Sequence, residues 1–168
     1  MTTMLKIYWA IIMRITLNQA EQKLAMYLAK ARYLNARNNG TKDLKVGGQS
    51  NEETDLEGIA GELVACKFFN VYPDTETNLK DLPKYDLLTS KGSRVDVKTT
   101  KYKNGRLLAT LNKKVCEVDI YVLVIGSFPV YDVVGWAKSE ELIAPENIMN
   151  LGRGDGYALS QDQLRAFK

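Results

Sequence analysis

The sequence predicts an α/β domain in which a mixed β-sheet is flanked by helices. Two amphipathic helical stretches come first, at 19–37 and 54–69, and short segments with strand periodicity follow from residue 85 to residue 137. At 168 residues, with 45% hydrophobic and 26% charged residues, the chain is long enough to bury one core. We therefore expect residues 1–168 to form a single domain.

Both helical stretches begin at a capping box, in which a polar side chain and an acid three residues later satisfy free backbone amides. Asn18 with Glu21 has this spacing before the first helix, and Thr54 with Glu57 before the second. Residues 38–53, between the helices, are polar and glycine-rich and are expected to form a mobile loop.

The second helix carries the acid of most interest, Glu62. At 100° per residue, Glu57 and Glu62 project about 140° apart, so only one of them can face a shared site. Because Glu57 is expected to cap the helix, Glu62 is the candidate for a functional role.

From Tyr85 the apolar pattern changes to a period of two, which is typical of strands. Three strands joined by tight turns are expected to form an antiparallel meander, at 85–89, 94–100 and 106–111. Two further strands are expected at 119–126 and 130–137. The first of these is nearly all apolar, which predicts a central position in the sheet.

The last part of the chain contains short helix signals and a glycine cluster. Ser139 is expected to cap a helix at 140–144, and Ser160 with Gln163 to cap a helix at 161–167. The glycines at positions 152, 154 and 156 are expected to form a turn, since no strand leads directly into them and no helix opens from them.

The N-terminal run from Met4 to Met13 is too short to cross a bilayer and lacks a signal-peptide cleavage pattern. Residues 1–12 are therefore expected to be a strand or a leader, and no contact with a membrane is expected. Cys66 and Cys116 lie in apolar stretches with no second thiol near either, which favours buried, unpaired cysteines and a cytoplasmic protein.

The chain contains no histidine. This excludes Ser-His-Asp and Cys-His nucleophile systems, histidine general bases and histidine metal sites. Any chemistry must use carboxylates, lysines, hydroxyls and a hard metal ion.

One predicted strand, RVDVKTT, carries a pattern suited to such chemistry. Strand alternation places Asp96, Lys98 and Thr100 on one face, and the preceding hairpin brings Asp86 beside Asp96. Two adjacent carboxylates repel each other unless a cation lies between them. Oxygen ligands without histidine or thiolate indicate Mg²⁺ or Mn²⁺.

The acid-x-lysine pattern alone has little value, since roughly two instances are expected by chance in this composition. It also occurs at Glu21 with Lys23, on a helix, and at Asp43 with Lys45, in the glycine-rich loop. Only Asp96 with Lys98 combines a strand, an upstream acid and a helical glutamate.

Over roughly residues 54–126, the segments GIAGELVACKFF, YDLLT and RVDVKTT resemble the PD-(D/E)XK, or restriction-endonuclease-like, nuclease superfamily, particularly its small phage and archaeal resolvase-like members. The sequence departs from that pattern in two places. Tyr85 stands at the position of the name-giving proline, and the link from Leu111 to Asp119 is short for the helix that the family places there.

The resemblance implies roles for five residues. Asp86 and Asp96 would ligate the metal, with the Val97 carbonyl as a further ligand. Lys98 would orient the attacking water or stabilise charge on the phosphate, and Glu62 would occupy a second-metal position or a position behind the ligands.

Residues 91–114 hold eight basic residues and one acid, a local net charge of +7 in a chain of net charge +3. Such a stripe around an acidic pocket is expected to bind the backbone of a nucleic acid, although a solvated hairpin face is the alternative. Besides Lys98, its basic residues are Lys91, Arg94, Lys101, Lys103, Arg106, Lys113 and Lys114.

The sequence thus predicts an endonuclease that uses Mg²⁺ or Mn²⁺ to hydrolyse DNA phosphodiester bonds. Two alternatives remain open: a catalytically inactive nucleic-acid-binding module of the same fold, and a structural or interaction domain. The choices between DNA and RNA, and between sequence-specific and structure-specific cutting, also remain open. A homodimer would suit paired cuts on a duplex.

Overall fold

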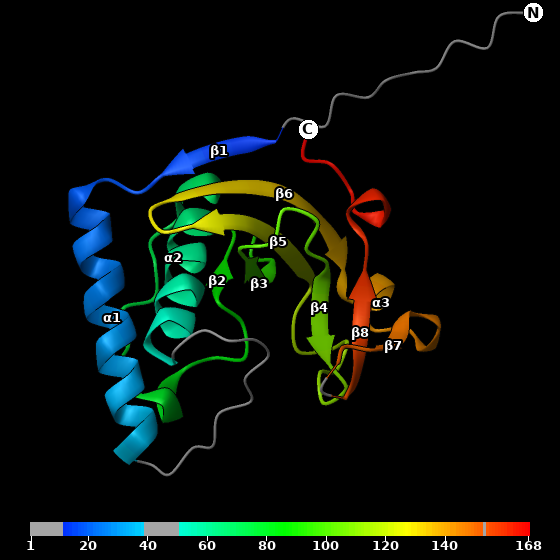
Figure 1. The fold of residues 1–168 in the computed structure, drawn as a ribbon, viewed down its shortest axis with the longest axis horizontal. Coiled ribbons are helices and arrows are strands. Elements are labelled where there is room, and N and C mark those ends of the chain that lie inside the picture. The colour runs from blue at the N-terminus through cyan, green and yellow to red at the C-terminus, as the bar shows by residue number, and fades with distance from the viewer. Residues whose placement is uncertain (1–11, 39–50, 153) are drawn as a thin grey trace, which may run out of the picture.

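The computed structural model describes residues 12–38, 51–152 and 154–168. These residues form a five-stranded mixed sheet, a three-stranded antiparallel sheet and three α-helices (Figure 1). The α/β prediction is confirmed. None of the helices in these ranges is long and apolar enough to span a membrane.

Two long helices lie side by side at one end of the molecule in Figure 1, α1 (Gln19–Asn38) and α2 (Asn51–Phe69). The first predicted capping box is confirmed: the Glu21 amide donates to Asn18 Oδ1 at 2.9 Å, and the Asn18 amide donates to the Glu21 carboxylate. The predicted loop lies mostly outside the described residues. Its two ends are helical, because Asn38 ends α1 and residues 51–53 begin α2.

The second predicted capping box is wrong, because α2 begins at Asn51 and Glu57 lies in its second turn. The Glu57 carboxylate instead accepts hydrogen bonds from the Phe128 amide, at 3.1 Å, and from the Tyr131 hydroxyl. Glu57 thus ties α2 to the turn between two strands. Because these hydrogen bonds engage both oxygens of Glu57, Glu62 stays the candidate of the two acids.

The five-stranded sheet has the order β1-β6-β5-β3-β2, and all its pairs are antiparallel except β3 with β5. The most apolar strand, β5, is in the centre, as predicted. The strand bounds are β1 Met13–Thr16, β2 Leu87–Leu88, β3 Arg94–Thr100, β5 Ile120–Ser127 and β6 Val130–Lys138. Residues 1–11, the greater part of the proposed leader, lie outside the described residues.

The predicted antiparallel meander is only half correct. The hairpin of β2 and β3 forms, but β4 (Leu107–Thr110) leaves β3 and pairs with β8 (Asp155–Leu159), which in turn pairs with β7 (Ile148–Asn150). The free edge of β3 is taken by β5. Parallel neighbours need a long crossover connection, and residues 101–119 provide it through β4 and a turn, without a helix.

The five-stranded sheet separates two hydrophobic cores. Val122 and Val124 of β5 face the helical side, where they pack in one core with Val64 of α2. Tyr121 and Leu123 face the other side and pack with β4, β8 and α3 (Ser139–Leu142). Because β5 is buried on both faces, its sequence is an almost continuous apolar run.

The C-terminal part differs from the prediction. Helix α3 has a single turn, and the predicted helix at 161–167 is a 3-10 turn at Gln161–Gln163 that the Ser160 capping box begins. The chain then extends because Arg165 exchanges two backbone hydrogen bonds with Trp136. The predicted turn is correct for the glycines at 152 and 154, which lie between β7 and β8 with positive φ angles, and wrong for Gly156, which lies in β8.

Candidate active site

The candidate site begins at Asp86, the residue before β2. Its amide donates to the Val95 carbonyl at 2.8 Å, and Val95 is also the register partner of Leu87. Two consecutive residues therefore lie opposite one, which is the arrangement of a β-bulge. A bulge re-aims the side chain, and here the Asp86 carboxylate turns to the edge of β3 and accepts a 2.6 Å hydrogen bond from the Val97 amide.

Asp96 is the buried centre of the site, with 2% of its surface exposed. It pairs in register with Tyr121 of β5 and so faces the core that contains β4 and α3. Two ammonium groups approach its carboxylate. Lys98 lies at ion-pair distance from Oδ1, and Lys113 Nζ lies 2.7 Å from Oδ2. The predicted face shared by Asp96 and Lys98 is thus present.

The two aspartates influence each other electrostatically. Burial, and then the negative charge of Asp96, raise the pKa of Asp86 to about 6 against an ordinary value of 3.8. The hydrogen bond from Val97 and the charges of Lys98 and Lys113 oppose this increase without cancelling it. The Asp86 carboxylate is therefore harder to ionise than in water, chiefly because it is buried.

Glu62 lies on α2 near the pair but has a cation of its own. Arg32 of α1 donates to its carboxylate at 3.2 Å, and the guanidinium also donates to the carbonyls of Asp74 and Glu76. Burial and the charge of Asp86 nevertheless raise the pKa of Glu62 to about 8. The charge of Asp86 thus affects the ionisation of Glu62, while the ion pair with Arg32 keeps the Glu62 carboxylate in place.

Gly61 determines how closely α2 approaches β3. A Cβ atom added at Gly61 would lie 1.8 Å from Thr99 Oγ1, so no side chain fits between the helix and the strand at this point. Because Glu62 is the next residue, this contact also sets the distance between Glu62 and β3. The Thr99 hydroxyl is buried there and has no hydrogen-bond partner within the described ranges.

The basic residues of the predicted stripe fall into separate groups. Lys113 lies in the site, and Arg94 is paired with Asp119 at 2.9 Å. The others do not form one stripe, because β3 separates the turn at its start from the loop at its end. Lys91 lies at the first end, and Lys101, Lys103 and Arg106 lie at the second, all of them exposed.

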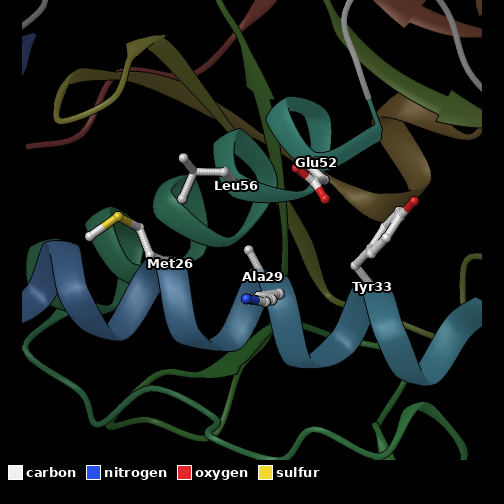
Figure 2. Close-up of a pocket in the computed structure, with 6 residues that line it drawn as sticks. Met26, Ala29, Tyr33, Glu52 and Leu56 are labelled. Carbon is white, nitrogen blue, oxygen red and sulfur yellow. The ribbon is translucent and has the colours of Figure 1, made fainter.

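Three of the hollows in the described part of the structure bear on the candidate acids and on the two long helices. One of about 320 Å³ is lined by Arg32 and Glu62, and another of about 330 Å³ is lined by Asp86. The third, drawn in Figure 2, has a volume of about 230 Å³ and lies between α1 and α2. It is lined by Met26, Tyr33 and Leu56, among others, and includes none of the candidate acids.

The sequence did not single out Arg32, and it predicted that Lys113 contacts the nucleic-acid backbone and not Asp96. Neither position carries a signal in the sequence, because Arg32 meets Glu62 through the packing of α1 on α2, and Lys113 reaches Asp96 through the crossover. Gly61 did leave a signal, since a glycine inside an amphipathic helix lowers its stability and often indicates close packing.

The cysteine prediction is confirmed for Cys66, which is buried, and is wrong for Cys116, which is exposed. Cys116 lies in the turn before β5, where its carbonyl accepts a 2.8 Å hydrogen bond from Arg94. No protein-family model matches the chain, and no curated protein matches it. The resemblance to PD-(D/E)XK nucleases therefore rests on the sequence pattern alone.

Proposed function

We propose that the protein is a cytoplasmic, restriction-endonuclease-like enzyme that uses Mg²⁺ or Mn²⁺ to hydrolyse phosphodiester bonds in DNA. The observation that carries this proposal is the meeting of Asp86 and Asp96 at a bulged hairpin, with lysines on the Asp96 carboxylate. Burial of two neighbouring acids is unfavourable in a purely structural role, and such arrangements concentrate at functional sites.

The residues present fit a hard divalent cation. Asp96 Oδ1 is buried and has the Lys98 ammonium at ion-pair distance, so a bound ion would share this oxygen with Lys98 or displace the ammonium. The N–H and C=O groups of a strand residue point to the same side, and the Val97 N–H meets Asp86, so the Val97 carbonyl also faces that carboxylate. Asp86, Asp96 and the Val97 carbonyl would hold the ion.

Three acidic or thiol side chains do not converge on one point within the described ranges. The proposed ion would therefore have only the two aspartates as side-chain ligands and would have to be one, such as Mg²⁺, that keeps several waters and takes one or two carboxylates from a protein. We assign Glu62 a supporting role beside Asp86: with a pKa of about 8 it is mostly protonated at neutral pH, and it would add negative charge to the site only when a bound cation lowers that pKa.

When bound, the metal ion lowers the pKa of its water and offsets negative charge on the phosphate. The side chains supply the rest. The ammonium of half-buried Lys98 lies beside Asp96 and can move to a phosphate oxygen, where it stabilises charge that grows in the transition state. The exposed lysines and arginines at both ends of β3 would bind the flanking backbone and position the scissile bond.

One observation favours a second candidate, the catalytically inactive DNA-binding module. Asp96 already has two ammonium groups as partners, so the cluster reaches electrical balance without a metal ion. In that case the lysines would be structural counter-ions. DNA would bind only through the exposed basic residues.

An assay of the purified protein separates the two candidates. Plasmid, single-stranded, nicked and four-way-junction DNA, with RNA as a control, are incubated with Mg²⁺, with Mn²⁺ or with EDTA. Cleavage that requires the metal is expected for the nuclease, and the preferred substrate identifies the kind of cutting. Salt-sensitive DNA binding without cleavage would favour the inactive module. Sedimentation with and without DNA would test the proposed homodimer.

A further inference from the structure

We infer that Lys113 is a second catalytic cation of this site, which contacts a non-bridging oxygen of the scissile phosphate together with Lys98. The inference rests on the proposed nuclease function and goes beyond it, because it gives Lys113 a part in the chemical step. The sequence alone placed this residue among the lysines that hold the DNA backbone.

The crossover between β4 and β5 brings Lys113 to the site. Its turn is closed by a hydrogen bond from the Lys113 amide to the Thr110 carbonyl, at 3.1 Å. Glu117 secures the other side, since its carboxylate accepts from the Lys114 amide and pairs with Lys84 at 2.6 Å. The turn is thus fixed at both ends, and the Lys113 ammonium is held at Asp96.

Neighbouring Lys114 shows that this placement is particular to Lys113. The two lysines follow one another in the same turn, yet Lys113 is half-buried with its ammonium at 2.7 Å from Asp96, and Lys114 is exposed. A general attraction between basic residues and DNA would not require one of them to reach a buried carboxylate.

The charges of the site indicate what a second lysine adds. When all three acids are ionised, as a bound cation would favour, Asp86 and Asp96 are balanced by Lys98 and Lys113, and Glu62 is balanced by Arg32. With one divalent cation included, the site has two net positive charges. A phosphodiester carries one negative charge before attack and two in the pentacovalent transition state. With both lysines the net charge of the site is thus equal and opposite to the charge of the transition state. With Lys98 alone it would be equal and opposite to the charge of the substrate.

The test compares three variants that each remove one positive charge: Lys113→Met, Lys114→Met, and Lys23→Met on the exposed face of α1. For each we measure the melting temperature, the DNA dissociation constant in EDTA and the single-turnover cleavage rate at saturating DNA. Lys113→Met is expected to cleave at least about tenfold more slowly than wild type, with less than about a threefold change in DNA affinity. Lys113→Arg, which keeps the charge, is expected to recover part of the rate.

A phosphorothioate at the cleaved bond provides a readout that a structural role would not change. Sulfur is a poor acceptor for an ammonium group, so wild type is expected to be slowed by one of the two sulfur diastereomers. In Lys113→Met the slowing caused by sulfur is expected to be smaller, by the same factor by which the substitution slows the cleavage of unmodified DNA. An unchanged slowing for both diastereomers, or a cleavage rate equal to that of Lys23→Met, would overturn the role of Lys113. Absence of metal-dependent cleavage by wild type would instead overturn the proposed function itself.

Discussion

Strand β3 carries two ion-pair clusters with opposite properties, only two residues apart. At its start, Arg94 forms a double hydrogen-bonded pair with Asp119, and its amide also donates to that carboxylate. These donors lower the pKa of Asp119 to about 2. Both side chains are partly exposed, and the pair links β3 to the start of β5.

In the inner cluster around Asp96, the pKa shift has the opposite direction. Its carboxylates are desolvated and close together, so the pKa of Asp86 is raised to about 6 even with two lysines nearby. An acid that ionises more easily than in water already has the partners it needs. An acid that ionises less easily gains most from an added cation. On the proposed function, the outer pair is structural and the inner cluster is the active site.

The largest expected effect is that of Asp96→Asn. The substitution keeps the shape of the side chain and removes the central negative charge, so cleavage is expected to fall at least about a thousandfold. DNA affinity in EDTA should stay the same or rise, because a negative charge is lost. Asp86→Asn should behave similarly. Cleavage by either variant at the wild-type rate would contradict the division between the two clusters.

A smaller loss is expected for Glu62→Gln, about ten- to a hundredfold in the cleavage rate, with little change in melting temperature. Glu57→Gln provides a contrast on the same helix. Glu57 accepts from the Phe128 amide and the Tyr131 hydroxyl, so its loss should lower the melting temperature and leave the cleavage rate of the folded protein unchanged. The reverse result would mean that Glu57, and not Glu62, serves the site.

The part of the site that could be predicted from sequence lies on one hairpin. The bounds of β3 were predicted correctly, and its alternation, with the turn before it, was enough to bring Asp86 to Asp96. Such local patterns are fixed by strand geometry. The roles of these residues stay predictions, as does the assignment to a nuclease family.

What could not be predicted depends on contacts between distant segments. The departure of β4 from the meander follows from the pairing of β3 with β5, which no local pattern reveals. The same pairing places Lys113 at Asp96. Arg32 reaches Glu62 only through the packing of α1 on α2, and the capping role of Glu57 was wrong because α2 begins earlier than its polar start suggested.

The raised pKa values predict how stability changes with pH in the absence of metal. Because the folded state holds protons on Asp86 and Glu62 more tightly than the unfolded state, stability should fall as pH rises from about 4 towards 8. Asp119 and Glu141, whose pKa values are lowered to about 2 from 3.8 and 4.5, change stability only below about pH 5. The melting temperature should thus be lower at pH 8 than at pH 5, by roughly 5 °C.

Added Mg²⁺ provides the control for this effect. It should raise the melting temperature more at pH 8, where the acids are ionised, than at pH 5, where protons compete for them. Asp86→Asn and Glu62→Gln should each flatten the pH dependence. A melting temperature that rises from pH 5 to pH 8 in EDTA would show that the protein already stabilises the ionised forms of Asp86 and Glu62, as it does for Asp119.

The smallest effect is expected from Asp119→Asn, which disrupts the outer pair. An exposed ion pair contributes little to stability, and the amide oxygen can still accept hydrogen bonds from Arg94, so the melting temperature should fall by no more than about 3 °C. The lost negative charge also leaves Arg94 freer to contact a phosphate. DNA affinity at low salt should therefore rise, and the salt dependence of binding should steepen by up to about one unit. Titrations of wild type and Asp119→Asn with an uncleaved DNA in EDTA at several salt concentrations measure both effects. If Asp119→Asn instead lost cleavage as strongly as Asp96→Asn, the outer pair would have to position β3 for the reaction, and the two clusters would form one functional unit.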